Sequence, residues 1–385
     1  MAEKPSKSRR TFKKDKADFK TKQHYHMSFQ YLSAEKKSLL QTGTVIPAHP
    51  LALNADRTLN EVYQRQLTRY YIASGAGGIA IGVHSTQFAI RSPHVNLYEK
   101  VLAIAADEIE RNRPPYPFLK IAGICGRTEQ AIKEAQLANQ YGYDLGLLSL
   151  GGLNEWSEDQ ILLHAKEVAE IIPIIGFYLQ PSVGGRIFSY DFWAKFAEIK
   201  HLEAIKVAPF NRYQTLDVVR ALCHSSRKDD IALYTGNDDN IVADLLTTYA
   251  FPINGKLVTK EFVGGLLGHW AVFTSKAVAL LEEIKTCKRT NFTGVQALLT
   301  KGVQVTDMNA VIFDSAHQFK GCIPGIHEVL RRQGLLPGRW CLDPEEDLSA
   351  GQMEEIDRIF NAYPDLVDHT FLQDFLIKDL SNGKR

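Results

Sequence analysis

Short apolar runs alternate with longer amphipathic stretches along most of the chain. The runs span residues 44–49, 78–83, 118–124, 145–150, 174–178, 204–208, 231–235 and 262–267. Continuous apolar runs of this length are typical of strands buried on both faces, as in a parallel sheet. Eight runs with helices between them predict an α/β fold, a closed (β/α)8 TIM barrel. An open doubly wound sheet is the alternative, but no GxGxxG motif follows the first run.

The stretches between the runs carry helix signals. Thr128 is a candidate N-cap for a helix that Gly142 ends, and Ser157-Glu-Asp-Gln160 fits a capping box. Apolar spacing predicts further helices at residues 59–73, 190–200, 212–224, 239–249 and 270–286. Beyond residue 290 the pattern is helical only, at 294–300, 313–333 and 353–363. We therefore expect three parts: an extension (1–40), the barrel (41–290) and a C-terminal helical region (291–385).

Composition and charge narrow the class of protein. The chain has 385 residues, 45% hydrophobic and 23% charged, which is typical of a globular protein and excludes a fibrous one. No apolar run approaches the roughly 20 residues of a membrane helix, and no apolar signal-peptide core is present. Residues 1–23 hold nine basic and three acidic residues, against 36 and 41 in the remainder. Without aromatic interleaving we expect a disordered, solvated tail rather than a nucleic-acid arm.

Cysteine usage indicates a reducing compartment. The five cysteines are far apart and form no CxxC pair or zinc-ligand spacing; they are Cys125, Cys223, Cys287, Cys322 and Cys341. Together with the missing signal peptide, this predicts a cytoplasmic protein without a structural metal.

In a barrel of this type the C-terminal ends of the strands build the active site. Lys206 lies inside the apolar run 204–208, where a lysine is costly unless it is paired or neutral. A desolvated, neutral amine is a nucleophile that can form a Schiff base with a carbonyl. Tyr178 ends the preceding run and could relay protons if the two strands are in matching register. The alternatives are an edge-strand lysine facing solvent and a core tyrosine.

Five motifs in order give the chain a family resemblance, over roughly residues 41–340. They are Ala73-Ser-Gly-Ala-Gly-Gly-Ile79, Gly176-Phe-Tyr-Leu-Gln-Pro181, Ala204-Ile-Lys-Val-Ala208, Gly236-Asn-Asp-Asp239 and the segment from Asn309 to Leu335. The chain resembles the dihydrodipicolinate synthase and N-acetylneuraminate lyase family of Schiff-base aldolases. The resemblance implies that Lys206 forms the imine and that Tyr178 is the catalytic phenol. It also implies a homo-oligomer, a dimer or tetramer.

Several positions depart from the family pattern. Where the family has GTTGE or GSTGE, this chain has Val83-His-Ser-Thr-Gln87. His84 then occupies the position of the relay hydroxyl, and Ser85 the position that holds the carboxylate of a 2-oxo acid. Imidazole titrates near neutrality, so His84 could replace the hydroxyl; a packing histidine is the alternative. Val83, Gly236, Asn237 and His49 complete the expected substrate-binding set.

Two further departures from the family pattern bear on the substrate. The tyrosine that the synthases carry after the fourth strand is missing from residues 149–154, and the expected arginine position is Val183, with Arg186 three residues later. A true dihydrodipicolinate synthase is therefore disfavoured.

Asp238 and Asp239 could be a metal pair, but we favour a turn before the helix at Ile241.

These observations predict a cofactor-free lyase or aldolase that acts on pyruvate or another 2-oxo acid through Lys206. A 2-keto-3-deoxy sugar acid dehydratase or hydratase-aldolase that uses the same imine is an open alternative. A non-catalytic barrel that senses a metabolite or binds a partner is another. We expect no membrane and no nucleic-acid partner.

Overall fold

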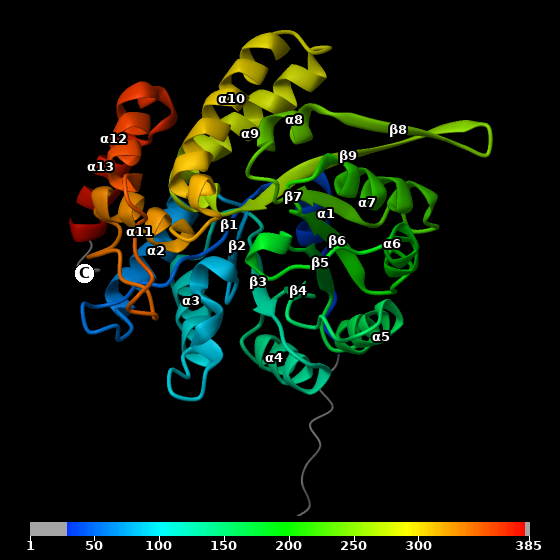
Figure 1. The fold of residues 1–385 in the computed structure, drawn as a ribbon, viewed down its shortest axis with the longest axis horizontal. Helices are drawn as coiled ribbons and strands as arrows, with labels where there is room; N and C mark the ends of the chain where they lie inside the picture. Colours follow the sequence, from blue (N-terminus) through cyan, green and yellow to red (C-terminus); the bar gives the residue numbers. More distant parts are fainter. Residues whose placement is uncertain (1–28, 382–385) are drawn as a thin grey trace, which may run out of the picture.

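The computed structural model describes residues 29–381. Eight parallel strands form the predicted (β/α)8 barrel (Figure 1), in the order β1-β9-β7-β6-β5-β4-β3-β2. A parallel bridge between Ala48 and Ala80 joins the two ends of this order. All eight predicted apolar runs coincide with strands: β1 (Val45–Pro47), β2 (Gly78–Ile81), β3 (Leu119–Ile124), β4 (Leu145–Ser149), β5 (Ile174–Tyr178), β6 (Leu202–Val207), β7 (Ala232–Thr235) and β9 (Lys256–Leu267).

Side chains alternate between the two faces of each strand. Ile175 and Phe177 belong to a small apolar cluster inside the barrel, together with Ala204 of the neighbouring strand β6. Ile174 and Tyr178 belong to the large cluster between the strands and the surrounding helices. This two-residue period decides which side chains can reach a site inside the barrel.

Helices connect the strands, and their ends follow local capping chemistry. They are α2 (Glu61–Ala73), α3 (Tyr98–Asn112), α4 (Thr128–Gln140), α5 (Glu158–Ala169), α6 (Tyr190–Phe196), α7 (Arg212–His224) and α8 (Ile241–Leu246). The capping box is confirmed, because Ser157 Oγ accepts from the Gln160 N–H at 3.2 Å and Gln160 Oε1 accepts from the Ser157 N–H at 2.8 Å. Thr128 as N-cap is wrong: Arg127 holds that position.

The helix before the barrel corrects the predicted extent of the N-terminal extension. Residues Ala34–Thr42 form helix α1, so residues 34–40 are a folded element. Leu40 is fully buried against the inner barrel cluster, and its carbonyl accepts a 2.9 Å hydrogen bond from Tyr234 Oη. Lys36 forms a 2.7 Å ion pair with Asp144 just before β4. Helix α1 therefore covers the N-terminal end of the barrel. The basic tail itself, residues 1–23, lies outside the described residues.

An antiparallel hairpin that the sequence pattern did not predict projects from the barrel. The helix predicted at 239–249 is present as α8 and ends before the hairpin begins. Strand β8 (Thr248–Ile253) pairs with the first half of β9, and the pair extends away from the barrel (Figure 1). Asn254 and Gly255 form the turn with φ of 50° and 76°. Both values are positive, as a type I′ turn requires, and Asn-Gly is its preferred sequence.

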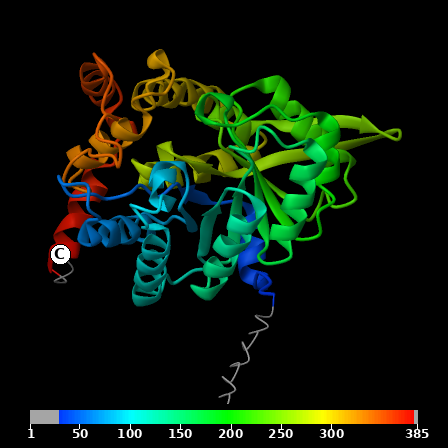
Figure 2. The same ribbon diagram turned by 60° about the horizontal axis from the view of Figure 1, so that its bottom comes forward.

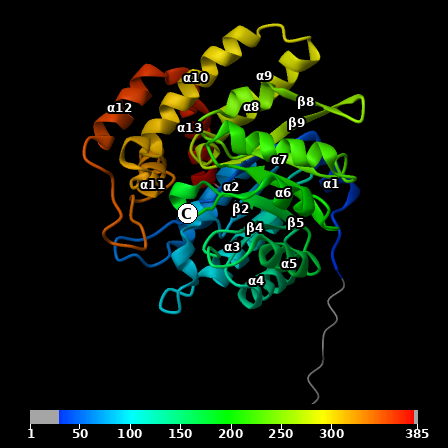
Figure 3. The ribbon, with the colours of Figure 1, turned by 45° about the vertical axis from the view of Figure 1, so that its right-hand side comes forward.

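The C-terminal helices gather on one side of the barrel, away from the hairpin tip (Figures 2 and 3). They are α9 (Thr274–Arg289), α10 (Val295–Ile312), α11 (Cys322–Arg332), α12 (Gln352–Ala362) and α13 (His369–Ser381). Within residues 29–381, no helix is long and apolar enough to cross a membrane. The five cysteines are all free thiols.

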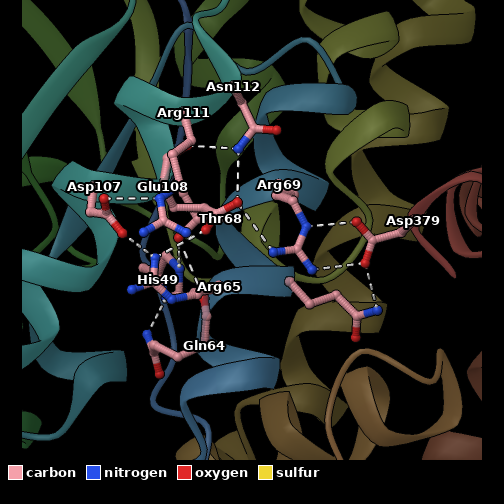
Figure 4. Close-up of polar contacts among 11 residues, drawn as sticks. His49, Gln64, Arg65, Thr68, Arg69, Asp107, Glu108, Arg111, Asn112 and Asp379 are labelled. Carbon is pink, nitrogen blue, oxygen red and sulfur yellow. Dashed lines mark hydrogen bonds and ion pairs between the residues drawn. The ribbon is translucent and has the colours of Figure 1, made fainter. Parts of the chain in front are cut away.

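A buried ion-pair network attaches the last helix to the barrel (Figure 4). Asp379 on α13 accepts hydrogen bonds from Arg69 Nε at 2.6 Å, Arg69 Nη2 at 2.9 Å and Gln66 Nε2 at 3.1 Å. Arg69 also contacts Glu108 of α3 at 3.2 Å. Both Arg69 and Asp379 are buried, so each charge depends on the other for solvation. The C-terminal helix is therefore an integral part of the structure.

Candidate active site at the C-terminal end of the barrel

A pocket opens at the C-terminal ends of the strands, where TIM-barrel active sites lie. Its empty volume is about 680 Å³, including the open mouth. Of the predicted site residues it is lined by Lys206, His84, Ser85, Val83 and Gly236. The side chains of Tyr178, His49 and Asn237 do not line it.

Lys206 points into the barrel from β6 and is buried. Its Nζ lies 4.1 Å from the centroid of the Phe177 ring. Gly236 packs against it so closely that a Cβ there would come within 2.5 Å of Lys206 Cε. Burial lowers the pKa of Lys206 to about 8, and the carboxylate of Asp238 opposes this shift. The amine is therefore much easier to deprotonate than an exposed lysine.

Asp238 faces the same pocket from the loop after β7. Burial raises the pKa of this carboxyl to about 7, opposed by Lys206 and by the His269 N–H. Its Oδ1 is buried and has no hydrogen-bond partner in the described part of the chain, and no ion pair joins it to Lys206 there. Asp238 was expected in a turn, but its place directly after a barrel strand is itself a signal for the site. Among residues 29–381, no three metal-binding side chains gather.

His84, Ser85 and Thr86 form a single helical turn after β2. His84 lines the pocket, and burial together with the charge of Lys206 lowers its pKa to about 4, so the ring is neutral at pH 7. Ser85 Oγ donates a 2.8 Å hydrogen bond to the Ala48 carbonyl. Thr86 Oγ1 accepts from the Gly82 N–H at 3.0 Å and donates to the His49 carbonyl at 2.7 Å. These bonds hold the turn against the end of β1.

The predicted placement of Tyr178 beside Lys206 is wrong. In the β5–β6 register Phe177 is opposite Lys206, and Tyr178 is opposite Val207. Tyr178 therefore points outward, where its ring lies 4.9 Å from that of Trp193 and its hydroxyl accepts a 3.4 Å hydrogen bond from the Phe188 N–H. An outward-facing side chain cannot reach the pocket without reversing the strand. Tyr178 is a core tyrosine.

His49 and Asn237 are also fully buried away from the pocket, against expectation. The His49 ring nitrogens lie 2.8 Å from the Pro50 carbonyl and 3.0 Å from Thr68 Oγ1 on α2. Asn237 donates to Asp244 at 2.8 Å and accepts from the Phe210 N–H at 3.1 Å. Both side chains hold loops at the pocket rim in place and are not in contact with it.

Comparison with known proteins shows the family and the fold. Residues 41–250 match the model of the dihydrodipicolinate synthetase family. Curated relatives include 4-hydroxy-tetrahydrodipicolinate synthases from Bifidobacterium longum (strain NCC 2705), 25% identical over 51% of this chain and 60% of that protein, and from Clostridium novyi (strain NT), 34% identical over 30% and 38%. The chain thus spans about 60% or less of the length of these two relatives.

Solved structures resemble the fold over most of the chain. A dihydrodipicolinate synthase from Oceanobacillus iheyensis superposes with a TM-score of 0.66 at 16% identity, covering 86% of this chain and 99% of that one. An N-acetylneuraminate lyase from Fusobacterium nucleatum, complexed with pyruvate, gives 0.63 at 17% identity, covering 85% and 99%. At such identities the likeness concerns the fold alone.

Proposed function

The chain belongs to the dihydrodipicolinate synthetase family, and from that premise we propose that it is a lyase or aldolase that binds pyruvate or another 2-oxo acid as a Schiff base on Lys206. The observation that carries the proposal is the buried amine at the end of the barrel. Lys206 is the one lysine that lines the pocket among the described residues, and its pKa is lowered. A lysine of this kind is an activated nucleophile for carbonyl carbon.

The reaction begins when the neutral amine of Lys206 attacks the ketone carbon. The nitrogen loses one proton and the former ketone oxygen gains one, which gives the carbinolamine. The carbinolamine then loses water to give the imine. The protonated imine accepts the electron pair released when the bond to the third carbon's substituent breaks, or when that carbon loses a proton. The resulting enamine takes up a proton at its third carbon, or attacks an aldehyde there, which restores the imine. Water then hydrolyses the imine and frees Lys206.

These steps need a proton carrier, and two groups in the pocket fit the need. Asp238 has a pKa raised to about 7, so it exchanges a proton near neutral pH, where general acid–base catalysis is most efficient. His84 is neutral and can accept a proton that passes between substrate and solvent. In this proposal Asp238 takes the part that the resemblance had assigned to Tyr178.

The carboxylate of the 2-oxo acid is expected at the turn of residues 84–86. The Ser85 hydroxyl proton is already used on the Ala48 carbonyl, so its N–H and that of His84 are the free donors of this turn within the described chain. Backbone N–H groups suit a carboxylate, because they carry partial positive charge without titrating.

A true dihydrodipicolinate synthase is disfavoured by the position of Arg186. Its guanidinium donates to the Trp156 carbonyl at 2.8 Å and lies over the Phe188 ring, 5.2 Å from its centroid. This side chain is therefore engaged outside the pocket, and Val183 lines the wall instead.

The test is reduction of the intact protein with borohydride in the presence of pyruvate, read by mass spectrometry. We expect a covalent adduct that maps to Lys206 and disappears in Lys206→Met. Lys120→Met is the matched control, since burial lowers the pKa of Lys120 as well but this lysine lies outside the pocket. An adduct that persists in Lys206→Met, or no adduct with pyruvate and a panel of other 2-oxo acids, would overturn the proposal.

A further inference from the structure

The wall of the pocket beyond Lys206 is apolar and aromatic. Phe210, Phe313 and Phe319 line it, together with the aliphatic side chains of Leu179, Val183 and Ile326. The polar side chains of the lining are His84, Ser85, Gln180, Lys206 and Asp238. The imine-forming end of the pocket is therefore polar, and the remainder offers mainly hydrocarbon surface to a substrate.

Two of the aromatic rings are held in place by strained backbone. Phe210 and Phe319 have φ of 53° and 65°, in the left-handed region that bulky residues rarely adopt. Such conformations are unfavourable and persist only where the surroundings impose them. Here Asn237 accepts from the Phe210 N–H, and the Asp314 carbonyl accepts from the Phe319 N–H at 2.9 Å.

The two rings also contact each other. Their centroids are 5.8 Å apart with an interplanar angle of 73°, an edge-to-face arrangement. Aromatic contacts of this kind add to the free energy of apolar burial. The wall is thus preformed rather than assembled around a ligand.

The charges in the pocket exclude a second anionic group on the substrate. Lys206 is the pocket's lone basic side chain apart from the neutral His84, within the residues described, and it is consumed by the imine. A second carboxylate would face Asp238 without a counterion. A polyol chain would meet only the Gln180 amide among the side chains of this wall, so most of its hydroxyl groups would be buried without hydrogen-bond partners.

We propose that the substrate is a 4-hydroxy-2-oxo acid whose fourth carbon also carries an uncharged aromatic group. This inference rests on the Schiff-base function proposed above. In the cleavage direction, the bond between the third and fourth carbons breaks, its electron pair enters the imine, and the hydroxyl proton of the fourth carbon leaves to a pocket base. The enamine left on Lys206 then takes up a proton at its third carbon, and water hydrolyses the imine. The products are pyruvate and an aromatic aldehyde, and the water consumed equals the water released when the imine formed.

The first experiment compares three aldehydes in condensation with pyruvate on the full chain: benzaldehyde, glyceraldehyde and succinic semialdehyde. Product is measured by chromatography at matched concentrations. We expect kcat/KM for benzaldehyde to exceed both others by about 100-fold, in the range that apolar pockets and unpaired polar groups reach together. Equal or better turnover of either polar aldehyde overturns the aromatic assignment.

Borohydride trapping with pyruvate alone separates this inference from the function on which it depends. If wild type is trapped and benzaldehyde is not preferred, the aromatic substrate is wrong and the Schiff base stands. If trapping itself fails, the proposed function is wrong.

The second experiment tests the wall directly. Phe319→Ala should lower the ratio of kcat/KM for benzaldehyde over acetaldehyde about tenfold, because the small aldehyde does not reach the ring. A ratio is insensitive to the fraction of folded protein. Phe292→Ala is the matched control, since Phe292 also has a positive φ, 62°, but lies outside the pocket. An unchanged ratio in Phe319→Ala would contradict the proposal.

Discussion

Removing the hydroxyl of Tyr178 tests two conflicting expectations. The family resemblance makes Tyr178 the proton carrier, whereas the alternation of side chains along β5 turns it away from the pocket. The Tyr178→Phe variant deletes one oxygen from the outer face of β5 and leaves the ring on Trp193. The lost bond is the 3.4 Å contact from the Phe188 N–H, which is long for a hydrogen bond. The expected cost is about 1 kcal/mol of folding free energy and a shift of a few degrees at most in Tm.

The same variant should leave chemistry untouched. Loss of a true general acid–base group costs about 10²–10⁴ in rate, or roughly 3–5 kcal/mol of activation free energy. Because Tyr178 points away from the pocket, we expect the rate of borohydride trapping with pyruvate to stay within about twofold of wild type, measured by stopped aliquots and mass spectrometry. A drop of two orders of magnitude, in a variant that retains the wild-type Tm, would refute the placement of Tyr178 and the register argument with it.

Three further outcomes follow from the site and the C-terminal attachment. The trapping rate should rise with pH and reach half its maximum near pH 8. The reason is that only the deprotonated amine of Lys206 reacts, and its pKa is lowered to about 8. A midpoint near 10.5 would mean an ordinary lysine. In Asp238→Asn the same midpoint should move to lower pH, because the carboxylate raises the pKa of Lys206. The maximal rate should also fall by at least about tenfold, because the proposed proton carrier is lost. A midpoint at higher pH would contradict this coupling. Asp379→Asn should lower the free energy of unfolding in urea by about 2–4 kcal/mol, because the buried Arg69 keeps only part of its partners. Asp374→Asn, on the exposed side of the same helix, should change it little. Equal effects would show that the buried pair does not hold the helix.

Local patterns were sufficient to predict most of the barrel. The barrel part of every strand is a buried apolar run, and burial on both faces is visible in a single sequence. The helix at 212–224 begins and ends as predicted. The hairpin was missed because no strand was predicted at 250–253, although Asn254-Gly255 between alternating residues is a strong hairpin signal. Helix α3 was missed too, despite apolar residues at Val101, Ala105 and Ile109 with helical spacing.

The proton carrier could not be predicted in the same way. The resemblance matched Tyr178 to the catalytic phenol because a proline follows it three residues later. In the structure, however, the residue of β5 beside Lys206 is Phe177, one position before Tyr178. In a strand a shift of one residue exchanges the two faces, so the motif match placed an outer residue inside the barrel. Strand pairing with β6 shows that Phe177 is the neighbour of Lys206, and only three-dimensional register supplies that information.

The residues proposed for chemistry and part of the proposed aromatic wall lie in different parts of the chain, although Phe210 of that wall lies with the former. Lys206, Asp238 and His84 fall within residues 41–250, the segment that matches the family model. Phe313 and Phe319 lie beyond it, on the segment between α10 and α11 that the C-terminal helices bring over the mouth of the barrel. Family membership therefore argues for the imine and says little about the group that the imine carries. If the aromatic wall sets the substrate, exchanging residues 313–326 for those of a sugar-acid lyase should change the aldehyde preference without moving the trapping site from Lys206, and loss of trapping in a folded chimera would contradict this division.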